Sequence, residues 1–382
     1  MKRKYVVCVP DGASDEPLAE LGGRTPLEAA ALPVLAALAA RGEVGRAATI
    51  PPGLPPGSDV GNLSILGYDP ARHHTGRAPI EAAAMGVDLD DDQVAYRCNL
   101  VQVDDGVMVD FAGGHPSSDD ARRVIAALDD ELGDERVRFH AGVQYRHLVT
   151  APEAWVDAEC TPPHDLTGRA AVWPTGPAAP LLRELMDASR AIVPRFGLAA
   201  NQVWLWGQGR RPRLPSFKDT YGVDAQLVSA VDLVRGLGAL TGIPAVAVPG
   251  ITGWYDTNYE GKRDACLQAL ADGADLFLIH VEASDEAGHA GDAAEKVRAL
   301  ENWDTRILGP LVAALDRDFR PWRLLLLPDH PTPTRLRTHT SDPVPYLLVD
   351  SEAPGPGGVY TERATAAAEP VPGHTLMARL IG

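Results

Sequence analysis

Residues Asp275–His289 read DLFLIHVEASDEAGH, and this stretch says more about the fold than any other. Its first half, Asp275–Val281, is a short run of large apolar residues, typical of a strand buried in a parallel sheet. The second half places Asp285 and His289 four residues apart, so a helical turn would bring both side chains to one face. Together they could bind one metal ion, although a helix cap explains either residue taken alone.

Two other predicted strands end in the same kind of residue. The run Tyr5–Val9 leads to Asp11, and the run RLLLLPD ends in Asp329, followed at once by His330 and nine residues later by His339. Because sites in open α/β sheets form beyond the carboxyl ends of the strands, we expect these six side chains to converge. Mixed carboxylate and imidazole ligands suit manganese, zinc or magnesium.

Strand and helix candidates alternate along much of the chain, which predicts an α/β fold, a parallel sheet wound with helices on both faces. A helix is expected over Leu27–Gly42, with Pro33 as its start or as a kink, and another over the apolar stretch from Val60 to Leu66. The remaining strand candidates are VWLWG (Val203–Gly207), PAVAVPG (Pro244–Gly250) and VPYLLVD (Val344–Asp350).

The texture changes between about Arg72 and about Arg190, where short alternating strands and loops rich in Asp and Pro replace the long apolar runs. A chain of 382 residues also exceeds one typical core. We therefore predict a sheet domain formed by residues 1–70 and 191–382, and a smaller α+β domain of residues 71–190 inserted into it.

Ser58 lies in the stretch PPGSD, after a glycine that lets the backbone turn sharply and before a predicted helix start. Backbone amides at such a start favour an anion on the serine oxygen. A plain helix-capping serine fits the local sequence equally well. The serine hydroxyl is a poor nucleophile near neutral pH, so a catalytic role requires a base or metal beside it.

The charge balance limits the classes of partner. Asp and Glu outnumber Lys and Arg by 52 to 35, a formal net charge of -17, which disfavours nucleic acid and anionic lipid. No apolar stretch approaches the roughly 18 residues of a membrane span, and the four scattered cysteines form no pair motif, so we expect reduced thiols and a cytoplasmic protein. A small anionic substrate would need a local cluster of cations. The oligomeric state, including a homo-oligomer, stays open.

Along nearly its whole length the chain resembles the archaeal-type cofactor-independent phosphoglycerate mutases of the alkaline phosphatase superfamily. The resemblance is strong because many motifs occur in one order, and it implies an alkaline phosphatase-like sheet with an inserted cap. These motifs are VPDGASD, GSDVGNLSILGYDP, GRAPIEAAAMG, AGGH, GVQYRHLV, PPHDLTG, WGQGRRPRLPSF, GITGWYDTNYEGK, HVEASDEAGHAGD and LPDHPTPTRLRTHTSDPVP.

The resemblance also implies roles for single residues. Ser58 would be the phosphorylated nucleophile and would share one metal ion with Asp11, Asp329 and His330, while a second metal ion would be held by Asp285, His289 and His339. The two divalent ions are expected to be Mn²⁺, with Mg²⁺ or Zn²⁺ as alternatives. The cap would offer His115 and Arg146 for substrate binding. Arg210 and Lys262 are two further candidates outside the predicted cap, and solvated surface roles stay open for all four. His164 and Asp165 receive no role.

The implied reaction interconverts 3-phosphoglycerate and 2-phosphoglycerate through a phosphoserine, in a site closed against water. Some stretches look closer to a bacterial branch of the family that has been proposed to act as homoserine kinase. A phosphotransferase acting on another small alcohol, or a metal-dependent phosphomonoesterase, is therefore the alternative. The sequence contains no GxxxxGK[ST] phosphate loop, which favours the mutase over an ATP-dependent kinase.

Overall fold

The computed structural model describes residues 2–382, which divide into two compact units. Unit 1 comprises residues 2–74 and 214–382, and unit 2 comprises residues 75–213. The sequence placed the second border at 190/191. The structure places it after Arg213, because strand β7 (Gln202–Arg210) pairs antiparallel with β3 (Gln93–Asp104) of unit 2. The prediction that VWLWG belongs to the main sheet was therefore wrong.

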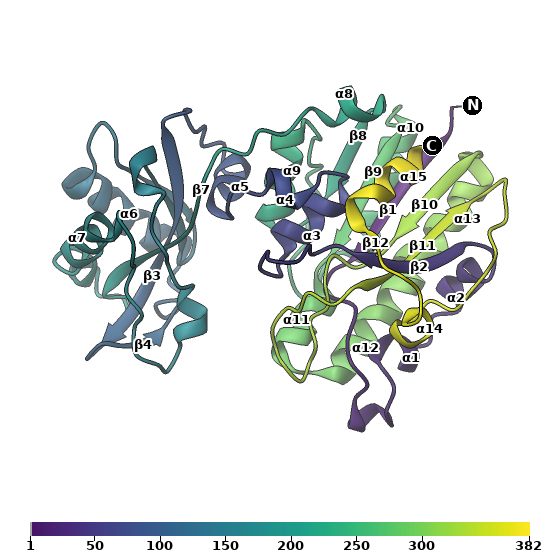
Figure 1. Ribbon diagram of the computed structural model, residues 1–382, viewed down its shortest axis with the longest axis horizontal. Coiled ribbons are helices and arrows are strands. Elements are labelled where there is room, and N and C mark those ends of the chain that lie inside the picture. Colours follow the sequence, from purple (N-terminus) through teal and green to yellow (C-terminus); the bar gives the residue numbers. More distant parts are fainter. Residues whose placement is uncertain (1) are drawn as a thin grey trace. The chain divides into compact units, whose positions relative to one another are not determined.

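Unit 1 is built on a seven-stranded mixed sheet, with the strand order β12-β2-β11-β10-β1-β9-β8 (Figure 1). The strands β10, β1, β9 and β8 run parallel, as expected. Their bounds are β1 Lys4–Pro10, β2 Glu43–Ala48, β8 Ala225–Val228, β9 Leu276–Val281, β10 Trp322–Leu326, β11 Val344–Asp350 and β12 Val371–Pro372.

The direction of β11 departs from the expectation of a parallel sheet, because β11 runs antiparallel to both β10 and β2. Parallel neighbours need a long crossover, usually a helix. The connection from β10 to β11 contains no helix within residues 327–343, so the chain turns back beside the strand it has just left.

Helices cover both faces of this sheet. The largest core lies on one face, where Val6 and Phe277 of the central strands pack with residues of α2, α10 and the segment Trp303–Leu308. On the unit as a whole the helices are α1 Pro26–Ala29, α2 Pro33–Ala39, α3 Ser58–Ile65, α4 Pro70–His73, α8 Phe217–Tyr221, α9 Asp232–Thr241, α10 Tyr259–Ala271, α11 Ala283–Ala290, α12 Ala293–Asn302, α13 Gly309–Asp318, α14 Glu362–Thr365 and α15 Leu376–Ile381.

Two local predictions in unit 1 need correction. The helix expected over Leu27–Gly42 is two helices, α1 and α2, because Pro33 begins the second one after a break. Proline is well tolerated in the first turn of a helix, where its missing N–H is not needed. The candidate strand Pro244–Gly250 makes only an isolated bridge from Ala245 to Leu227, and two prolines in seven residues explain why it does not extend.

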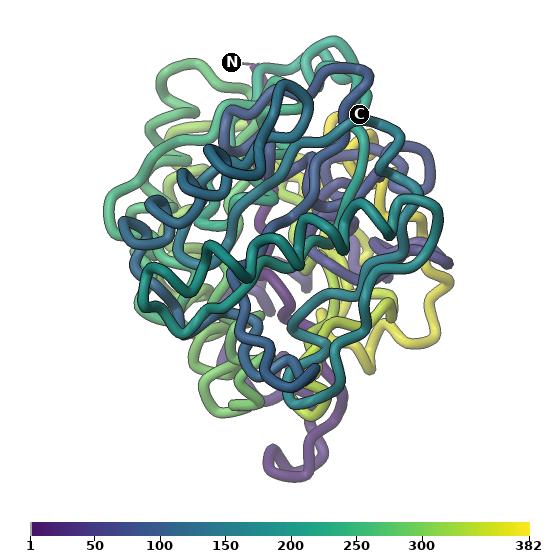
Figure 2. The backbone as a smooth tube through the Cα atoms, turned by 90° about the vertical axis from the view of Figure 1, so that its left-hand side faces the viewer, coloured from purple at the N-terminus to yellow at the C-terminus, as the bar shows by residue number. Residues whose placement is uncertain are grey.

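Unit 2 contains a five-stranded antiparallel sheet with helices packed against it. This is the α+β architecture that the sequence predicts for the inserted domain. Helices α6 and α7 pack against each other, and Figure 2 shows them from their outer side. The long strand β3 pairs with β4, β6 and β7. The other elements are β4 Val107–Asp110, β5 Arg138–Val143, β6 Arg146–Pro152, α5 Ala78–Ala84, α6 Ser118–Leu132 and α7 Ala179–Ser189.

Candidate active site

Three strand ends of unit 1 meet, as the sequence predicts. Strand β1 lies between β10 and β9, so the chain segments that leave their carboxyl ends are neighbours (Figure 1). These segments carry Asp11, Asp329 and, at the start of α11, Asp285. All three carboxylates are buried, with exposed fractions of 2%, 0% and 8%. Three buried carboxylates this close together call for positive charge between them.

One group of ligand atoms surrounds Asp285. Helix α11 places His289 one turn after Asp285, with 3.3 Å between His289 Nε2 and Asp285 Oδ2. His339 Nε2 lies 3.5 Å from Asp285 Oδ1 and 2.9 Å from His289 Nε2. His289 Nδ1 lies 3.1 Å from the carbonyl oxygen of Arg337, which only accepts, so Nδ1 carries the proton and Nε2 faces the group. The arrangement is that of a metal site.

The electrostatics of this group fit a cation. Although burial opposes it, hydrogen bonds from His289 and His339 hold the pKa of Asp285 well below its usual range. Burial lowers the pKa of His289, but the bonded Asp285 carboxylate outweighs this and raises it to about 9. In the absence of a metal ion a proton on His289 thus supplies the positive charge that a divalent cation would supply.

The second group forms around Asp11 and Asp329. His330 Nε2 lies 3.4 Å from Asp329 Oδ2, 3.7 Å from Asp11 Oδ1 and 3.1 Å from Ser58 Oγ. The sequence assigned His330 to this group alone. The structure also brings a His330 ligand atom within 4.8 Å of ligand atoms of Asp285 and His339, so His330 lies between the two groups. Burial lowers its pKa to about 4, which keeps the imidazole neutral, as a metal ligand must be.

Sequence reasoning missed His280, which belongs to the second group. Ligand atoms of Asp11, His280 and Asp329 all lie within 4.8 Å of one another. Burial, followed by the charges of Asp329 and Asp285, raises the pKa of Asp11 well above its usual range. The signal for His280 was a polar residue inside the otherwise apolar run of β9, which is unusual for a buried strand.

Ser58 is the first residue of α3, and Gly57 takes the capping position. The alternative of a helix-capping serine therefore does not hold. Helix α3 packs directly against Asp329. Asn62 Nδ2 donates to Asp329 Oδ2 at 2.8 Å and to Ser58 O at 3.0 Å. A Cβ added at Gly61 would lie 2.4 Å from Asp329 O, so only glycine allows this approach. Gly61 and Asn62 were not identified from the sequence.

A buried lysine braces the loops that carry the carboxylates. Lys296 is fully buried, and its Nζ contacts Asp15 Oδ2 at 3.0 Å, Thr332 O at 2.8 Å and Ser14 O at 3.2 Å. Thr332 Oγ1 in turn donates to Asp285 Oδ1. This network joins the loop after β1 to the loop after β10. It therefore fixes the position of the ligand group around Asp285 relative to the group around Asp11 and Asp329.

The four residues predicted to bind substrate have different surroundings. Lys262 is fully buried on α10, where its Nζ pairs with Glu282 and donates to His280 O at 2.8 Å. It is therefore not available on the surface of unit 1, because α10 packs this face of the helix onto β9. In unit 2, Arg210 pairs with Glu153 at 2.6 Å and is half exposed.

His115 and Arg146 are exposed and lie against the same ring. The His115 ring is 5.4 Å from that of Tyr145, and the Arg146 guanidinium is 6.0 Å from its centre. Phe111 contacts both the Tyr145 ring and the His164 ring. The structure thus joins two of the predicted residues to a single aromatic surface of unit 2, and places His164 at its edge.

Next to this surface, the buried Arg97 forms an ion pair with Glu81. Neither residue was identified from the sequence. His164 stacks edge-on against Trp206 at 5.3 Å, and the Arg97 guanidinium lies 4.3 Å from a Trp206 ring centre. Arg97 Nε pairs with Glu81 Oε2 at 2.8 Å. Burial lowers the pKa of Arg97 to about 10, and the charges of Arg77 and Arg146 contribute to this. Arg97 is itself buried and already paired with Glu81, whereas Arg146 is an exposed cation of this face.

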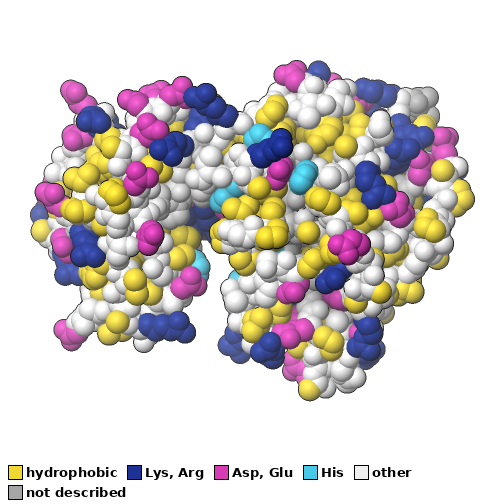
Figure 3. Space-filling model, in the orientation of Figure 1, with side chains coloured by type: hydrophobic (Ala, Val, Ile, Leu, Met, Phe, Trp, Pro, Cys, Tyr) yellow, Lys and Arg dark blue, Asp and Glu magenta, His cyan; other side chains and the backbone are white. Residues whose placement is uncertain are grey.

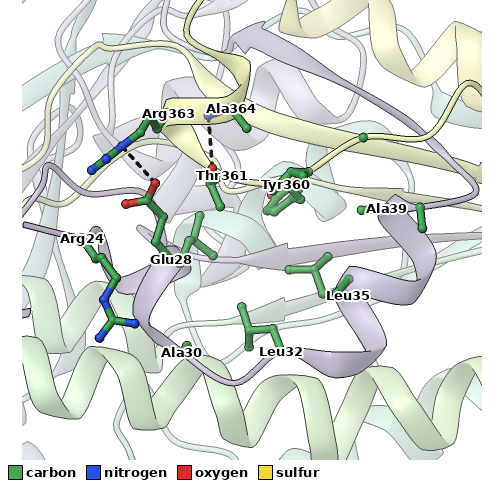
Figure 4. Close-up of a pocket in the computed structure, with 15 residues that line it drawn as sticks. Arg24, Glu28, Ala30, Leu32, Leu35, Ala39, Tyr360, Thr361, Arg363 and Ala364 are labelled. Atoms are coloured by element: carbon green, nitrogen blue, oxygen red, sulfur yellow. Dashed lines mark hydrogen bonds and ion pairs between the residues drawn. The ribbon is translucent and has the colours of Figure 1, made fainter.

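A cavity elsewhere in unit 1 is a separate feature. It has a volume of about 780 Å³ and is lined by α1, α2 and residues 358–364, with the Glu28–Arg363 ion pair at one side (Figure 4). Its lining is mainly apolar and contains none of the predicted metal ligands.

Acidic and basic side chains are interspersed on the face drawn in Figure 3, with no broad basic surface there. Within residues 2–382 no helix is both long enough and apolar enough to cross a membrane.

Comparisons with known proteins show which family the chain resembles. A profile of the 2,3-bisphosphoglycerate-independent phosphoglycerate mutases matches residues 39–195. The phosphoglycerate mutase of this kind from Methanosarcina acetivorans is 45% identical over 93% of each chain. Among solved structures, a Pyrococcus horikoshii protein covers 100% of this chain and 97% of its own, with 26% identity and a TM-score of 0.81.

The cofactor-independent phosphoglycerate mutase from Thermoplasma acidophilum also has a similar structure, with a TM-score of 0.66, 25% identity and coverage of 100% of this chain and 99% of its own. The likeness to the Methanosarcina acetivorans sequence extends over nearly the whole chain. The chain belongs to the 2,3-bisphosphoglycerate-independent phosphoglycerate mutase family.

Proposed function

We propose that the protein interconverts 3-phosphoglycerate and 2-phosphoglycerate through a phosphoserine at Ser58. The observation that carries the proposal is the seat of Ser58: its Oγ lies 3.1 Å from His330 Nε2, at the edge of a buried cluster of Asp and His ligand atoms. A serine held at such a cluster has the activation that an isolated hydroxyl lacks. Membership of the mutase family supports the choice of reaction.

The residues present fit two divalent cations. One ion is assigned to Asp285, His289 and His339, and the other to Asp11, Asp329, His330 and Ser58. When bound, the ions supply Lewis-acid stabilisation of the transferring phosphoryl oxygens. Mixed carboxylate and imidazole donors are compatible with Mn²⁺, Mg²⁺ and Zn²⁺, of which we propose Mn²⁺.

The chain's own groups then perform two half-reactions. Ser58 Oγ forms a bond to phosphorus while the bond from phosphorus to a glycerate oxygen breaks, and the proton lost by the serine ends on that oxygen. The glycerate turns, its other hydroxyl takes the phosphoryl group back as the bond from phosphorus to Ser58 Oγ breaks, and the proton lost by that hydroxyl returns to Ser58 Oγ. Backbone N–H groups in the first turn of α3 are oriented toward the anion on Ser58.

Unit 2 is proposed as the cap, with His115 and Arg146 as binding groups for the substrate's anionic groups. Their exposure and shared contact with Tyr145 support this assignment. Arg210 is a weaker candidate because Glu153 already neutralises it. Lys262 is assigned a role behind the metal ligands instead, since it is fully buried. A cytoplasmic location follows from the substrate and stays a prediction.

The experiment follows both products of purified protein with Mn²⁺ and 3-phosphoglycerate, in the absence of 2,3-bisphosphoglycerate. Formation of 2-phosphoglycerate without free phosphate is the expected result. Free phosphate alone would instead assign a phosphomonoesterase. The absence of any product would favour phosphoryl transfer to another small alcohol. An assay of the same protein with homoserine and ATP then tests this alternative.

A further inference from the structure

His280 has an unusual environment for a buried histidine. It lies near the end of β9, and its exposed fraction is 0%. Among residues 2–382 its Nε2 atom has no hydrogen-bond partner, and the same is true of Asp11 Oδ1. Burying polar atoms without partners is costly, roughly 1–3 kcal/mol for each atom. Two such atoms in one cluster indicate that something absent from the protein chain satisfies them.

The other nitrogen of His280 is firmly held. Nδ1 lies 3.3 Å from Glu282 Oε1 and 3.2 Å from Ser229 Oγ, and Ser229 Oγ donates to the same Glu282 oxygen. Glu282 is buried and forms an ion pair with the fully buried Lys262. A carboxylate only accepts, so Nδ1 carries the proton and the Nε2 lone pair is directed at Asp11.

A histidine held in this way is a recognised preparation for metal binding. Ligating histidines usually donate their second N–H to a carboxylate, which fixes the tautomer and raises the basicity of the ligand nitrogen. Here Glu282 is that carboxylate, and the fully buried Lys262 anchors it. The need to orient His280 explains why Lys262 and Glu282 are buried as an ion pair next to the cluster.

The spacing of the atoms agrees with ligation rather than with a hydrogen bond. His280 Nε2 lies 3.4 Å from Asp11 Oδ2, beyond the usual range of about 2.7–2.9 Å for a charge-assisted bond. The predicted ligand pairs have the same spacing: 3.4 Å for His330 and Asp329, and 3.3 Å for His289 and Asp285. Ligands about 2.0–2.1 Å from one tetrahedral ion lie roughly 3.3–3.4 Å apart.

We propose that His280 Nε2 is a ligand of the divalent cation held by Asp11 and Asp329. The inference rests on the metal centre of the proposed function, but it concerns coordination and not turnover. It assigns four histidines to the two ions: His280, His289, His330 and His339. It also leaves His330, which lies between the two groups, free to contact either ion.

The test counts imidazole ligands by X-ray absorption of the Zn²⁺-loaded protein, together with Mn²⁺ titration by calorimetry. The variant is His280→Asn, whose amide can still reach Glu282 but not Asp11. The matched control is Ser229→Ala, which removes a neighbour of Nδ1 and leaves Nε2 in place. Thermal melting of both variants confirms that they fold.

The wild-type protein should show four imidazoles shared by two ions, and His280→Asn should show one fewer. Loss of a residue that only supports a ligand lowers metal affinity roughly 10–100-fold. In His280→Asn the Mn²⁺ ion held by Asp11 and Asp329 should lose more affinity than that. In Ser229→Ala the loss should be no more than about tenfold. Three imidazoles in the wild type, or an unchanged count in His280→Asn, would overturn the proposal.

The wild-type count decides the question even if His280→Asn fails to fold. The test also separates this inference from the proposed reaction. Four imidazoles in a protein that does not convert phosphoglycerate would leave the ligand assignment standing and refute the mutase. Turnover with three imidazoles would do the reverse, because it would keep the reaction and reduce His280 to a residue that orients Asp11.

Discussion

Gly61→Ala should separate catalysis from stability, because the glycine sits where α3 approaches Asp329. An added Cβ would lie 2.4 Å from Asp329 O, whereas ordinary contact begins at 3.4 Å. The helix must therefore move by about 1 Å, and Ser58 and Asn62 move with it. A displacement of that size at a reacting group can lower the rate by on the order of 100-fold.

The free energy of unfolding should change less than the transition-state stabilisation in this variant. Overpacking costs roughly 1–3 kcal/mol. The higher helix propensity of alanine returns about 1 kcal/mol of that. We therefore expect a net loss of about 0–2 kcal/mol in the free energy of unfolding, against about 2.7 kcal/mol in transition-state stabilisation for the 100-fold effect.

The assay measures kcat/KM for 3-phosphoglycerate with saturating Mn²⁺, and urea unfolding of the same sample. The control is Gly253→Ala, where the added Cβ meets nothing within 4 Å. A Gly61→Ala enzyme that keeps its kcat/KM within twofold of the control would refute the idea that the seat of α3 on Asp329 positions Ser58.

Three further outcomes are expected. Ser58→Ala should abolish turnover and phosphoserine formation, seen by mass spectrometry, while metal content and melting temperature stay near those of the wild type; retained turnover would exclude the covalent route. Because His289 binds a proton up to pH about 9 in the metal-free protein and must lose it to bind metal, Mn²⁺ affinity should rise with pH, by at most about tenfold per unit for this one proton; calorimetry at pH 7 and 8 that shows a fall would contradict the assignment. Arg146→Ala should raise KM for phosphoglycerate with little change in unfolding, because the side chain is exposed; the comparison is Arg138→Ala, an exposed arginine of the same unit that pairs with Asp129, and equal KM values in the two variants would remove Arg146 from the binding groups.

Much of the sheet of unit 1 was predictable because its parallel strands are short apolar runs with a polar residue directly after them. Strand β2 (Glu43–Ala48) and strand β8 (Ala225–Val228) were missed, since neither has such a run. VWLWG has the composition of a buried strand, but composition does not say which sheet a strand joins. Pairing with β3 decided this, and it moved the border of unit 2 past Arg210.

The sequence by itself determined the α/β class, the convergence of Asp11, Asp285 and Asp329, and the helical spacing of Asp285 and His289. These features depend on local pattern and on the rule that sites form at the carboxyl ends of parallel strands. Tertiary structure alone decided the place of His280, the burial of Lys262 and the need for glycine at position 61. Each of these depends on atoms brought together from distant segments at distances of a few ångströms, and a one-dimensional pattern does not encode which atoms meet.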